Sequence, residues 1–540
     1  MMRPNPWRLA ALLILIVAVF GGAGLVKGAF YIGKHEGDTL HLAEIVLRMA
    51  AGQWPHLDFM TPIGALAMAP LALLVRLGAG LGHAIFLSQI LVALILMPAV
   101  IRVARSRFGS PWGWAYGGFV MILCVALVHG EAQRAVSISM HYNRWSWAIA
   151  YVVLPLVMIA PEGRARPWLD GVILGLGMAA LVLIKATYFA ALMPAVVVTL
   201  LARRWWGMAG AALVAGLAVA GIVTLWAGAG FWAAYLGDLV AVATSPTRPQ
   251  PGEPWTAVVA APAFMGASLT LVAAVILLRQ AGRMSEGLML LLLMPGFFYI
   301  VFQNFGNDPQ WLVLVALFAL RLRPAPGLRG GFGWDLGAAL SQVAVLALAF
   351  GAPSALNLGY SPFRHLATPA EKMIPLLSGL PAHDDVLALE ARIHGMTLTV
   401  AGDGPDTPYA GYRAMADRGE PALLNGEELP VCEQQTGVVA WFETVTRELI
   451  ANGHAGQRLM AADLYSSFWF WGDFRPVEGA APWSYGGTAG LGNADYLVVP
   501  LCPVAASVRN SMLKALIDES WRLTEVERTP LYILIEASAP

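Results

Sequence analysis

Twelve long apolar runs dominate this chain of 540 residues and limit what it can fold into. A helix that crosses a bilayer needs about 20 mostly apolar residues, with some allowance either way. Only 13% of the residues are charged and 58% are hydrophobic, as in polytopic membrane proteins. The sequence therefore predicts an α-helical membrane protein. The runs cover residues 8–30, 62–75, 82–101, 112–130, 145–160, 168–184, 187–202, 207–229, 256–278, 287–302, 310–320 and 333–352.

Arginines between these runs predict the membrane topology of the chain, because basic residues favour the cytoplasmic side of short loops. They cluster at every second loop only if the run 62–75 does not cross the membrane. That run is short and is interrupted by Pro62, Gly64 and Pro70. We therefore expect it to lie in the outer interface, which leaves eleven spanning helices. The clusters are Arg3 and Arg8; Arg102, Arg105 and Arg107; Arg164 and Arg166; Arg203 and Arg204; Arg279 and Arg283; and Arg321, Arg323 and Arg329.

The last 187 residues differ from the rest of the chain in charge. They hold half of all charged side chains, 22 acidic and 12 basic. We expect a membrane module over residues 1–353 and a soluble domain over 354–540. The predicted topology places this domain outside, in the periplasm, with the chain in the inner membrane of a bacterial cell. Residues 497–500 and 531–535 are typical of buried strands and 504–518 of a helix, which predicts an α/β domain.

Two cysteines of this tail, Cys432 and Cys502, could form a disulfide in an outer compartment. Bridging requires Cα atoms within about 7 Å of each other, and the sequence alone leaves that distance open.

The polar stretch from Lys34 to Glu44 follows the first apolar run directly. Acids at a membrane surface are costly unless they bind or react with something. After Asp38, apolar residues recur at helical spacing, so Asp38 is also placed to cap a helix. From this loop alone, capping and chemistry are equally favoured.

The loop resembles the first-loop motif of the GT-C superfamily of membrane glycosyltransferases. The resemblance is carried by Asp38, by Ala43-Glu44 and by the stretch Met49 to Gly52, and Asp58-Phe59 before Pro62-Ile63-Gly64 is similar to the next part of that loop. The order of spans and loops agrees over residues 1–350. The resemblance implies a GT-C-like fold and a catalytic role for Asp38 on a polyprenyl-phosphate sugar. Further substrate-binding candidates in the loop are Glu36, His41, Glu44 and Asp58.

A second outer loop carries Arg134, His141, Asn143 and Arg144. Arginine can donate to phosphate oxygens in a forked geometry, which suits a lipid phosphate. The alternative is that Arg144 only anchors a helix end at the headgroups. Many GT-C proteins place aspartate in this loop, whereas this chain has only Glu131, so the use of a divalent metal is doubtful and no cofactor is expected with certainty.

Three later positions complete the candidates. Lys185 lies between two apolar runs, where it either extends to the interface or binds an anion. It resembles a lysine at the equivalent turn of the aminoarabinose transferases, which faces lipid phosphate. Tyr235 belongs to the loop 230–255, which could close over a lipid donor or be an unstructured linker. Asn304 could contact sugar hydroxyls or cap a helix end.

Together these features predict an inverting glycosyltransferase that moves a hexose or pentose from a polyprenyl-phosphate donor to a glycan, lipid or protein acceptor on the outer face. Membrane lipids are expected partners and nucleic acids are not. Two alternatives are open. A transporter should show repeat symmetry or broken helices, and a non-enzymatic envelope-assembly protein would use Asp38 only as a cap. An outward cavity that contains Asp38, Lys185 and Arg144 would favour the transferase.

Overall fold

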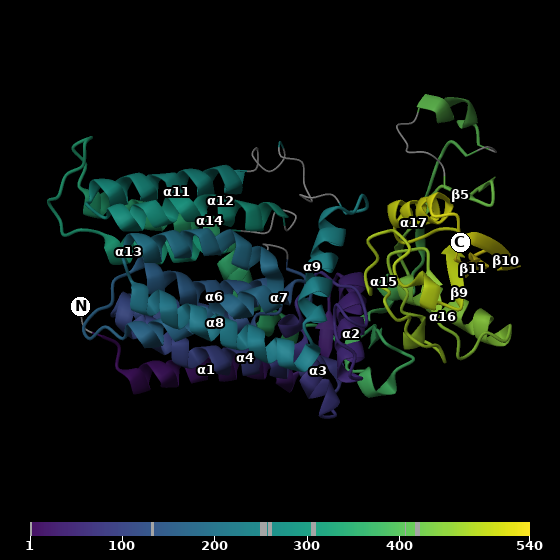
Figure 1. Ribbon diagram of the computed structural model, residues 1–540, viewed down its shortest axis with the longest axis horizontal. Helices are drawn as coiled ribbons and strands as arrows, with labels where there is room; N and C mark the ends of the chain where they lie inside the picture. Colours follow the sequence, from purple (N-terminus) through teal and green to yellow (C-terminus); the bar gives the residue numbers. More distant parts are fainter. Residues whose placement is uncertain are drawn as a thin grey trace.

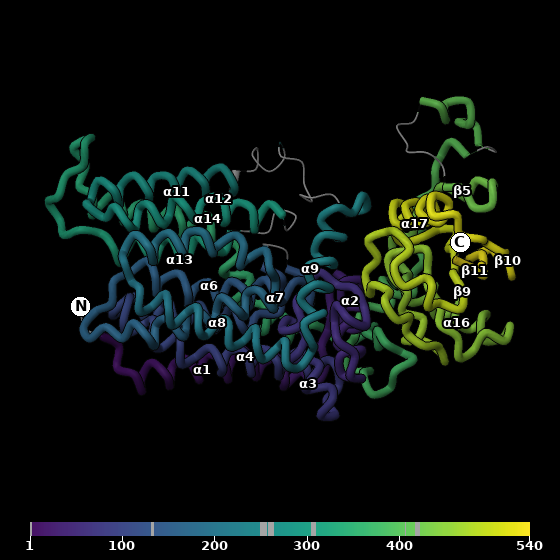
Figure 2. Tube along the Cα trace, in the orientation of Figure 1, coloured from purple at the N-terminus to yellow at the C-terminus, as the bar shows by residue number. Residues whose placement is uncertain are grey.

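The computed structural model describes residues 3–130, 134–248, 256, 262–303, 309–404, 407–415 and 422–539. A bundle of long helices forms one end of the molecule and the C-terminal domain forms the other (Figure 1). The chain starts at the end of the bundle far from that domain (Figure 2). The main helices of the bundle are α1 (Pro6–Val26), α4 (Leu81–Val103), α5 (Trp112–Val125), α6 (His141–Met158), α7 (Pro167–Ala202), α8 (Trp206–Ala227), α11 (Pro262–Gln280), α12 (Met284–Gln303), α13 (Trp311–Leu322) and α14 (Leu336–Leu366).

Six of the described helices are long and apolar enough to cross a membrane, namely α1, α4 with the turn that follows it, α7, α8, α12 and α14. Shorter apolar helices cover 112–125, 230–243, 264–280 and 311–322. The protein is therefore a multi-pass membrane protein. The number of eleven spans stays a prediction.

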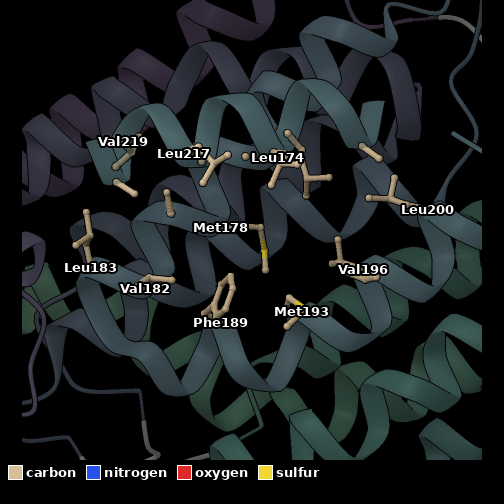
Figure 3. Close-up of a pocket in the computed structure, with 18 of the residues that line it drawn as sticks. Leu174, Met178, Val182, Leu183, Phe189, Met193, Val196, Leu200, Leu217 and Val219 are labelled. Atoms are coloured by element: carbon tan, nitrogen blue, oxygen red, sulfur yellow. The ribbon is translucent and has the colours of Figure 1, made fainter. Parts of the chain in front are cut away.

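The two runs expected at 168–184 and 187–202 together form α7. Lys185 breaks this helix, with φ −155° and ψ 103°. In Figure 3, Leu174 to Leu183 and Phe189 to Leu200 run in opposite directions. The two runs are thus a helical hairpin that turns at Lys185.

Small residues bring α8 close to the first half of this hairpin. A Cβ added at Gly171 would lie 2.4 Å from the Met208 carbonyl oxygen, and one at Gly175 would lie 2.1 Å from that of Ala212. Two glycines four residues apart on one helix face allow two membrane helices to approach at backbone distance. This spacing explains why α7 and α8 pack tightly.

Charged residues from several loops meet at one end of the bundle. Arg321 Nε donates to the Arg107 carbonyl oxygen at 2.7 Å, and its Nη2 lies 2.5 Å from Glu162. Arg102 and Arg107 pair with Asp170 at 2.9 and 2.7 Å. The N-terminus lies at this same end, opposite the C-terminal domain (Figure 1). Loops expected on one side of the membrane therefore lie together.

The run at 62–75 forms the short elements η1 (Ala65–Ala67) and α3 (Ala69–Arg76). Eight residues of α-helix are about 12 Å long, whereas the hydrocarbon core of a bilayer is about 30 Å thick. α3 is thus too short to cross. The expected loop at 230–255 is different: residues 230–243 form helix α9 (Gly230–Ala243), so an unstructured linker is wrong for this part. α9 lies where the bundle meets the C-terminal domain (Figure 1).

The C-terminal domain is an α/β unit. Its main sheet has the order β10 (Arg522–Arg528), β11 (Tyr532–Ser538), β9 (Tyr496–Pro500), β8 (Leu459–Ala461), with β8 and β9 parallel and the other pairs antiparallel. The domain also contains α16 (Val438–Ala451) and α17 (Ala506–Asp518). The two expected buried strands and the expected helix are confirmed.

Smaller elements complete this domain. Two short antiparallel pairs join β4 (Thr397–Val400) with β7 (Cys432–Thr436) and β5 (Leu423–Leu424) with β6 (Glu427–Glu428). The short helices are α15 (Glu390–Ile393), η3 (Pro381–His383), η4 (Ala410–Met415), η5 (Phe468–Phe470) and η6 (Leu491–Asn493). Cys432 and Cys502 form a disulfide, with their Cα atoms 5.0 Å apart.

One helix continues across the boundary expected at residue 353, and one strand of the membrane module pairs with a strand of the C-terminal domain, so that boundary needs correction. It falls inside α14, which continues to Leu366. In addition, β1 (Phe30–Ile32) of the first outer loop pairs in parallel with β3 (Val386–Leu389), whose other edge carries β2 (Met373–Pro375). The first outer loop is therefore built into the C-terminal domain.

Candidate functional site

Helix α2 (Glu36–Ala50) connects the membrane module to the C-terminal domain. Its acids Glu36 and Asp38 lie in the first turn, where the helix dipole favours negative charge. Glu36 accepts from Nε and Nη2 of Arg392, and the buried carboxylate of Glu44 accepts from the Ser467 hydroxyl. Glu36 and Glu44 thus attach α2 to the C-terminal domain.

Other residues of α2 also pack closely against the C-terminal domain. A Cβ at Gly37 would lie 2.1 Å from the Tyr465 hydroxyl oxygen, so only glycine leaves room for that side chain. In the last turn of α2, Arg48 Nη2 donates to the Val477 carbonyl oxygen at 3.0 Å. These contacts fix the helix that carries Asp38.

Asp38 does not cap α2. The residue that precedes the helix is His35, at φ 67°, and no side chain caps the helix there. The Asp38 carboxylate instead accepts a 2.6 Å hydrogen bond from Ser139 Oγ and lies 3.7 Å from His35 Nδ1. Burial raises the pKa of Asp38, although Ser139, His35 and Arg248 act in the opposite direction. The side chain stays 28% exposed, and this exposed part faces a cavity.

The cavity has a volume of about 610 Å³ and lies where the module, α9 and the C-terminal domain meet. Residues far apart in the sequence form its walls. The polar and aromatic side chains among them are His35, Asp38, His41, His129, Ser139, Tyr142, Lys185, Thr187, Thr247, Arg248, Tyr299, Gln303, Trp483, Ser484, Tyr485 and Ser507.

Two basic side chains line this cavity, and burial, then the charge of Arg248, lower the pKa of Lys185 to about 7, so a bound anion favours its charged form. Lys185, at the turn of the α7 hairpin, donates from Nζ to Asn143 Oδ1 at 3.1 Å and lies 5.3 Å from the centre of the Tyr142 ring. Arg248, shortly after α9, donates from Nη1 to the Tyr485 hydroxyl at 3.5 Å. A carboxylate and two cations thus face one cavity, a combination that suits a ligand with both a hydroxyl and an anionic group.

Three histidines also face the cavity. The rings of His35 and His129 stack at 5.7 Å, and burial lowers the pKa of His129 to about 4. Burial, and then the charge of Arg248, lower the pKa of His41 to about 3. His41 and His129 are therefore neutral near pH 7, when imidazole can donate one hydrogen bond and accept another.

Helix α9 is held by partly buried polar contacts on the segment that leads to Arg248. Tyr235 donates to the Val182 carbonyl oxygen of α7 at 2.7 Å. Asp238 lies 2.8 Å from His56 Nδ1 and accepts from the Thr61 backbone N–H at 3.0 Å. Tyr235, expected to bind substrate, thus connects α9 to α7 and is absent from the cavity lining.

The four substrate-binding candidates of the second outer loop lie outside the cavity lining. Asn143 supports Lys185, as described above. Arg144 has no exposed surface and donates to the Leu123 carbonyl oxygen at 3.2 Å. The His141 ring is buried, and Arg134 is exposed. None of these four lines the cavity. The cavity expected around Asp38, Lys185 and Arg144 therefore contains the first two, with Arg248 as its second cation.

Of the remaining candidates, His41 lines the cavity, whereas Glu36, Glu44 and Asp58 do not. Asp58 Oδ2 accepts from the Trp54 backbone N–H at 2.6 Å and so closes a turn. Asn304 lies outside the described residues.

Sequence reasoning did not commit to Arg248 or Ser139. A signal existed for Arg248, which is the only basic residue between 230 and 255. Ser139 gave none, because a serine in an outer loop is ordinary and its partner is 101 residues away. Among the described residues, no three His, Cys, Asp or Glu side chains are placed to hold a metal ion together.

An apolar pocket of about 420 Å³ lies between the two halves of the α7 hairpin and α8 (Figure 3). Val182 and Leu183 line it, two residues before Lys185 enters the lining of the polar cavity. Trp232 of α9 closes part of it. The apolar pocket and the polar cavity therefore lie next to each other at the turn of α7.

No family model and no curated protein matches the chain. Two solved structures are similar to it. The crystal structure of ArnT from Cupriavidus metallidurans has a TM-score of 0.42 and 13% identity, with 97% of each chain covered. The arabinofuranosyltransferase AftD from Mycobacteria has a TM-score of 0.37 and 12% identity; the match covers 98% of this chain and 40% of AftD.

Proposed function

We propose that this protein is an inverting membrane glycosyltransferase that uses a polyprenyl-phosphate sugar. One observation carries the proposal: a single cavity is lined by the carboxylate of Asp38 and by the cations Lys185 and Arg248. Glycosyl transfer needs a base for the acceptor hydroxyl and positive charge for the departing phosphate. The first-loop resemblance points to the same carboxylate.

Asp38 suits the role of base. Burial raises the pKa of its carboxyl group, and a carboxylate of raised pKa is the stronger proton acceptor. Ser139 holds one carboxylate oxygen at 2.6 Å and so fixes its direction. General-base catalysis contributes typically about 10²–10⁴-fold.

Lys185 and Arg248 suit the phosphate. Asn143 positions the Lys185 ammonium group, and Tyr485 positions the Arg248 guanidinium group. Two fixed cations stabilise the charge that builds on the leaving oxygen more strongly as the bond breaks.

The apolar pocket beside Lys185 supports a lipid-linked donor. Its lining is hydrocarbon from α7, α8 and Trp232 (Figure 3). A polyprenyl chain in this pocket would place its phosphate at the turn of α7, where Lys185 lies. The donor would thus enter from the bilayer and need no soluble nucleotide.

In the proposed reaction, the acceptor oxygen attacks the anomeric carbon while Asp38 takes the hydroxyl proton. A new bond forms between that oxygen and the anomeric carbon. The bond from the anomeric carbon to the phosphate oxygen breaks, and polyprenyl phosphate leaves with the electron pair. Single displacement inverts the anomeric centre. With the arginine-rich end in the cytoplasm, the cavity and the C-terminal domain lie outside, in the periplasm of a Gram-negative cell.

The test uses purified full-length protein in lipid nanodiscs with synthetic polyprenyl-phosphate pentoses and hexoses. Mass spectrometry measures the release of polyprenyl phosphate. Asp38→Asn should slow release by at least about a hundredfold, the lower range of general-base contributions. Asp335→Asn is the matched control, because Asp335 caps α14 at the other end of the bundle and asparagine caps equally well.

Two further results bear on the proposal. Lys185→Ala and Arg248→Ala should raise the KM for donor as well as lower kcat, because a phosphate contact acts in the ground state and the transition state. Cells that lack the protein should accumulate the donor, and mass spectrometry of their lipids would identify its sugar. Unchanged release by Asp38→Asn would overturn the assignment of the base.

A further inference from the structure

The C-terminal domain supplies a wall of the cavity that is chemically unlike the rest. Seven of its residues line the cavity and none of them is charged, whereas Asp38, Lys185 and Arg248 all come from the membrane module. The wall combines the aromatic rings of Trp483 and Tyr485 with the hydroxyl groups of two serines, Ser484 and Ser507. Aromatic faces beside a few polar groups are typical of sites that bind neutral organic molecules.

Trp483 is held in a fixed orientation. Its ring packs edge-on against Tyr465 at 5.4 Å and lies 5.4 Å from the ring of His41. The next residue, Ser484, donates its backbone N–H to the Leu464 carbonyl oxygen at 2.9 Å. The indole is only half-buried, so part of it faces the cavity. A preorganised ring loses little freedom when a ligand packs on it.

His41 has hydrogen-bonding capacity that the described residues leave unused. Its side chain is 93% buried and lines the cavity, and its Nε2 has no partner among the described residues. A buried polar atom without a partner is costly unless a ligand or water satisfies it. His41 follows Asp38 by three residues on α2, so both lie on one face of the helix.

We propose that His41 and Trp483 form a subsite for the ring of an uncharged sugar, the acceptor of the transfer. The C–H face of the ring packs on the indole, while ring hydroxyls bond to His41 Nε2 and Ser484. One helical turn away, Asp38 takes the proton of the attacking hydroxyl. This inference rests on the proposed transferase function and selects a glycan among glycan, lipid and protein acceptors.

Because the domain wall of the cavity carries no charge, we expect it to bind neutral sugars in preference to acidic ones. A carboxylate or phosphate at Trp483 would lose hydration, the seven domain residues of the wall carry no charge, and Arg248, which contacts the wall at Tyr485, binds the donor phosphate in the proposed reaction. Burial keeps His41 neutral near pH 7, since its pKa is about 3, so it supplies a hydrogen bond without a positive charge.

Binding is tested without chemistry, on the full-length Asp38→Asn protein in nanodiscs. Saturation-transfer NMR is recorded with neutral methyl pentosides and methyl hexosides, and with a methyl glucuronide. We expect signal from neutral glycosides that falls at least about fivefold with Trp483→Leu and recovers with Trp483→Phe, which keeps an aromatic face. Trp226→Leu is the matched control, because Trp226 is 76% exposed on α8 and does not line the cavity.

Kinetics on the otherwise unmodified protein separate the acceptor from the donor. Trp483→Leu should raise the KM for a neutral glycoside acceptor about tenfold and leave the KM for donor within about twofold. An equal rise in both would overturn the acceptor assignment. So would the absence of any Trp483-dependent NMR signal, or an equal signal from the glucuronide. Failure of the transferase itself appears separately, as no polyprenyl phosphate released by the wild-type protein.

Discussion

Ser139 Oγ donates a 2.6 Å hydrogen bond to the carboxylate of Asp38 across 101 residues of sequence. The serine is almost fully buried, in the segment that precedes α6. In that segment the Ser137 backbone N–H donates to the Leu127 carbonyl oxygen at 2.9 Å, and the Leu127 backbone N–H donates to Ser361 Oγ of α14 at 2.9 Å. The orientation of the proposed base thus depends on contacts between distant parts of the chain.

Ser139→Ala should shift the pH profile of transfer. Burial raises the pKa of Asp38 above its usual 3.8, and the Ser139 hydrogen bond opposes this rise. Without the hydroxyl, the pKa of Asp38 rises further. Because the base acts when deprotonated, the acidic limb of kcat/KM against pH should move to higher pH, and activity above the limb should fall less than in Asp38→Asn.

The control for this shift is Ser88→Ala, which removes another buried serine hydroxyl, bonded to the Ile85 carbonyl oxygen at 2.9 Å. Its acidic limb should stay in place. A Ser139→Ala profile that coincides with the wild-type profile would show that a group other than Asp38 sets the acidic limb.

Asp38→Asn should stabilise the folded protein at neutral pH. The pKa of Asp38 is raised in the folded state, so ionising the carboxyl group costs folding free energy above that pKa. Below the usual value of about 3.8 the carboxyl is protonated in both folded and unfolded chains, and the cost disappears. The Tm of Asp38→Asn should therefore exceed that of the wild type at pH 7, with a gap that narrows toward pH 4. A lower Tm at pH 7 would contradict the raised pKa.

The sequence predicted apolar helices because hydrophobic length is a local property, while the number of spans stays a prediction. The hairpin at Lys185 and the short α3 followed from charge and proline positions within each segment. The boundary at 353 could not be found in this way. The apolar run ends near residue 352, but α14 continues to Leu366 as a more polar helix beside the first outer loop.

The candidate site was predictable only in part. Asp38 and Lys185 stood out as charges near apolar runs, but their roles were expected from the family resemblance of their segments; both line the cavity. Arg144 has the same local signal but bonds to a neighbouring helix carbonyl, and sequence cannot show which way a side chain points. Ser139 enters the cavity only through a partner 101 residues away, so no local pattern marks it.

Asp238→Ala should weaken donor binding without removing a cavity residue. Asp238 connects α9 to the first outer loop through His56 and the Thr61 backbone, and the chain reaches Arg248 ten residues later. Loss of these bonds frees α9 and displaces Arg248. The KM for donor should rise about tenfold, equivalent to about 1.4 kcal/mol, a usual size for a hydrogen bond to a charged group. Asp518→Ala, in an exposed pair with Lys514, is the control; an unchanged KM in Asp238→Ala would refute this positioning role.

The Cys432–Cys502 disulfide should stabilise the C-terminal domain. It closes a separation of 70 residues, and disulfides over such loops contribute typically about 2–4 kcal/mol. The double variant Cys432→Ala/Cys502→Ala should unfold at lower temperature than the wild type, and reductant should destabilise the wild type alone. Peptide mapping that found both thiols free in protein from the native host would remove this prediction.

The last prediction concerns orientation. Arg102, Arg107 and Arg321 come together at the end of the bundle opposite the C-terminal domain. Short loops rich in arginine favour the cytoplasm, so we expect the cavity and the domain to face outward. Reporter fusions at Arg107 should show a cytoplasmic location and fusions at Pro540 a periplasmic one. The two locations should differ, because Arg107 lies in the loop region at the end of the bundle opposite the C-terminal domain. A periplasmic Arg107 would turn the cavity toward the cytoplasm, where nucleotide sugars are available and the disulfide would be reduced, and the lipid-linked donor would lose its main support.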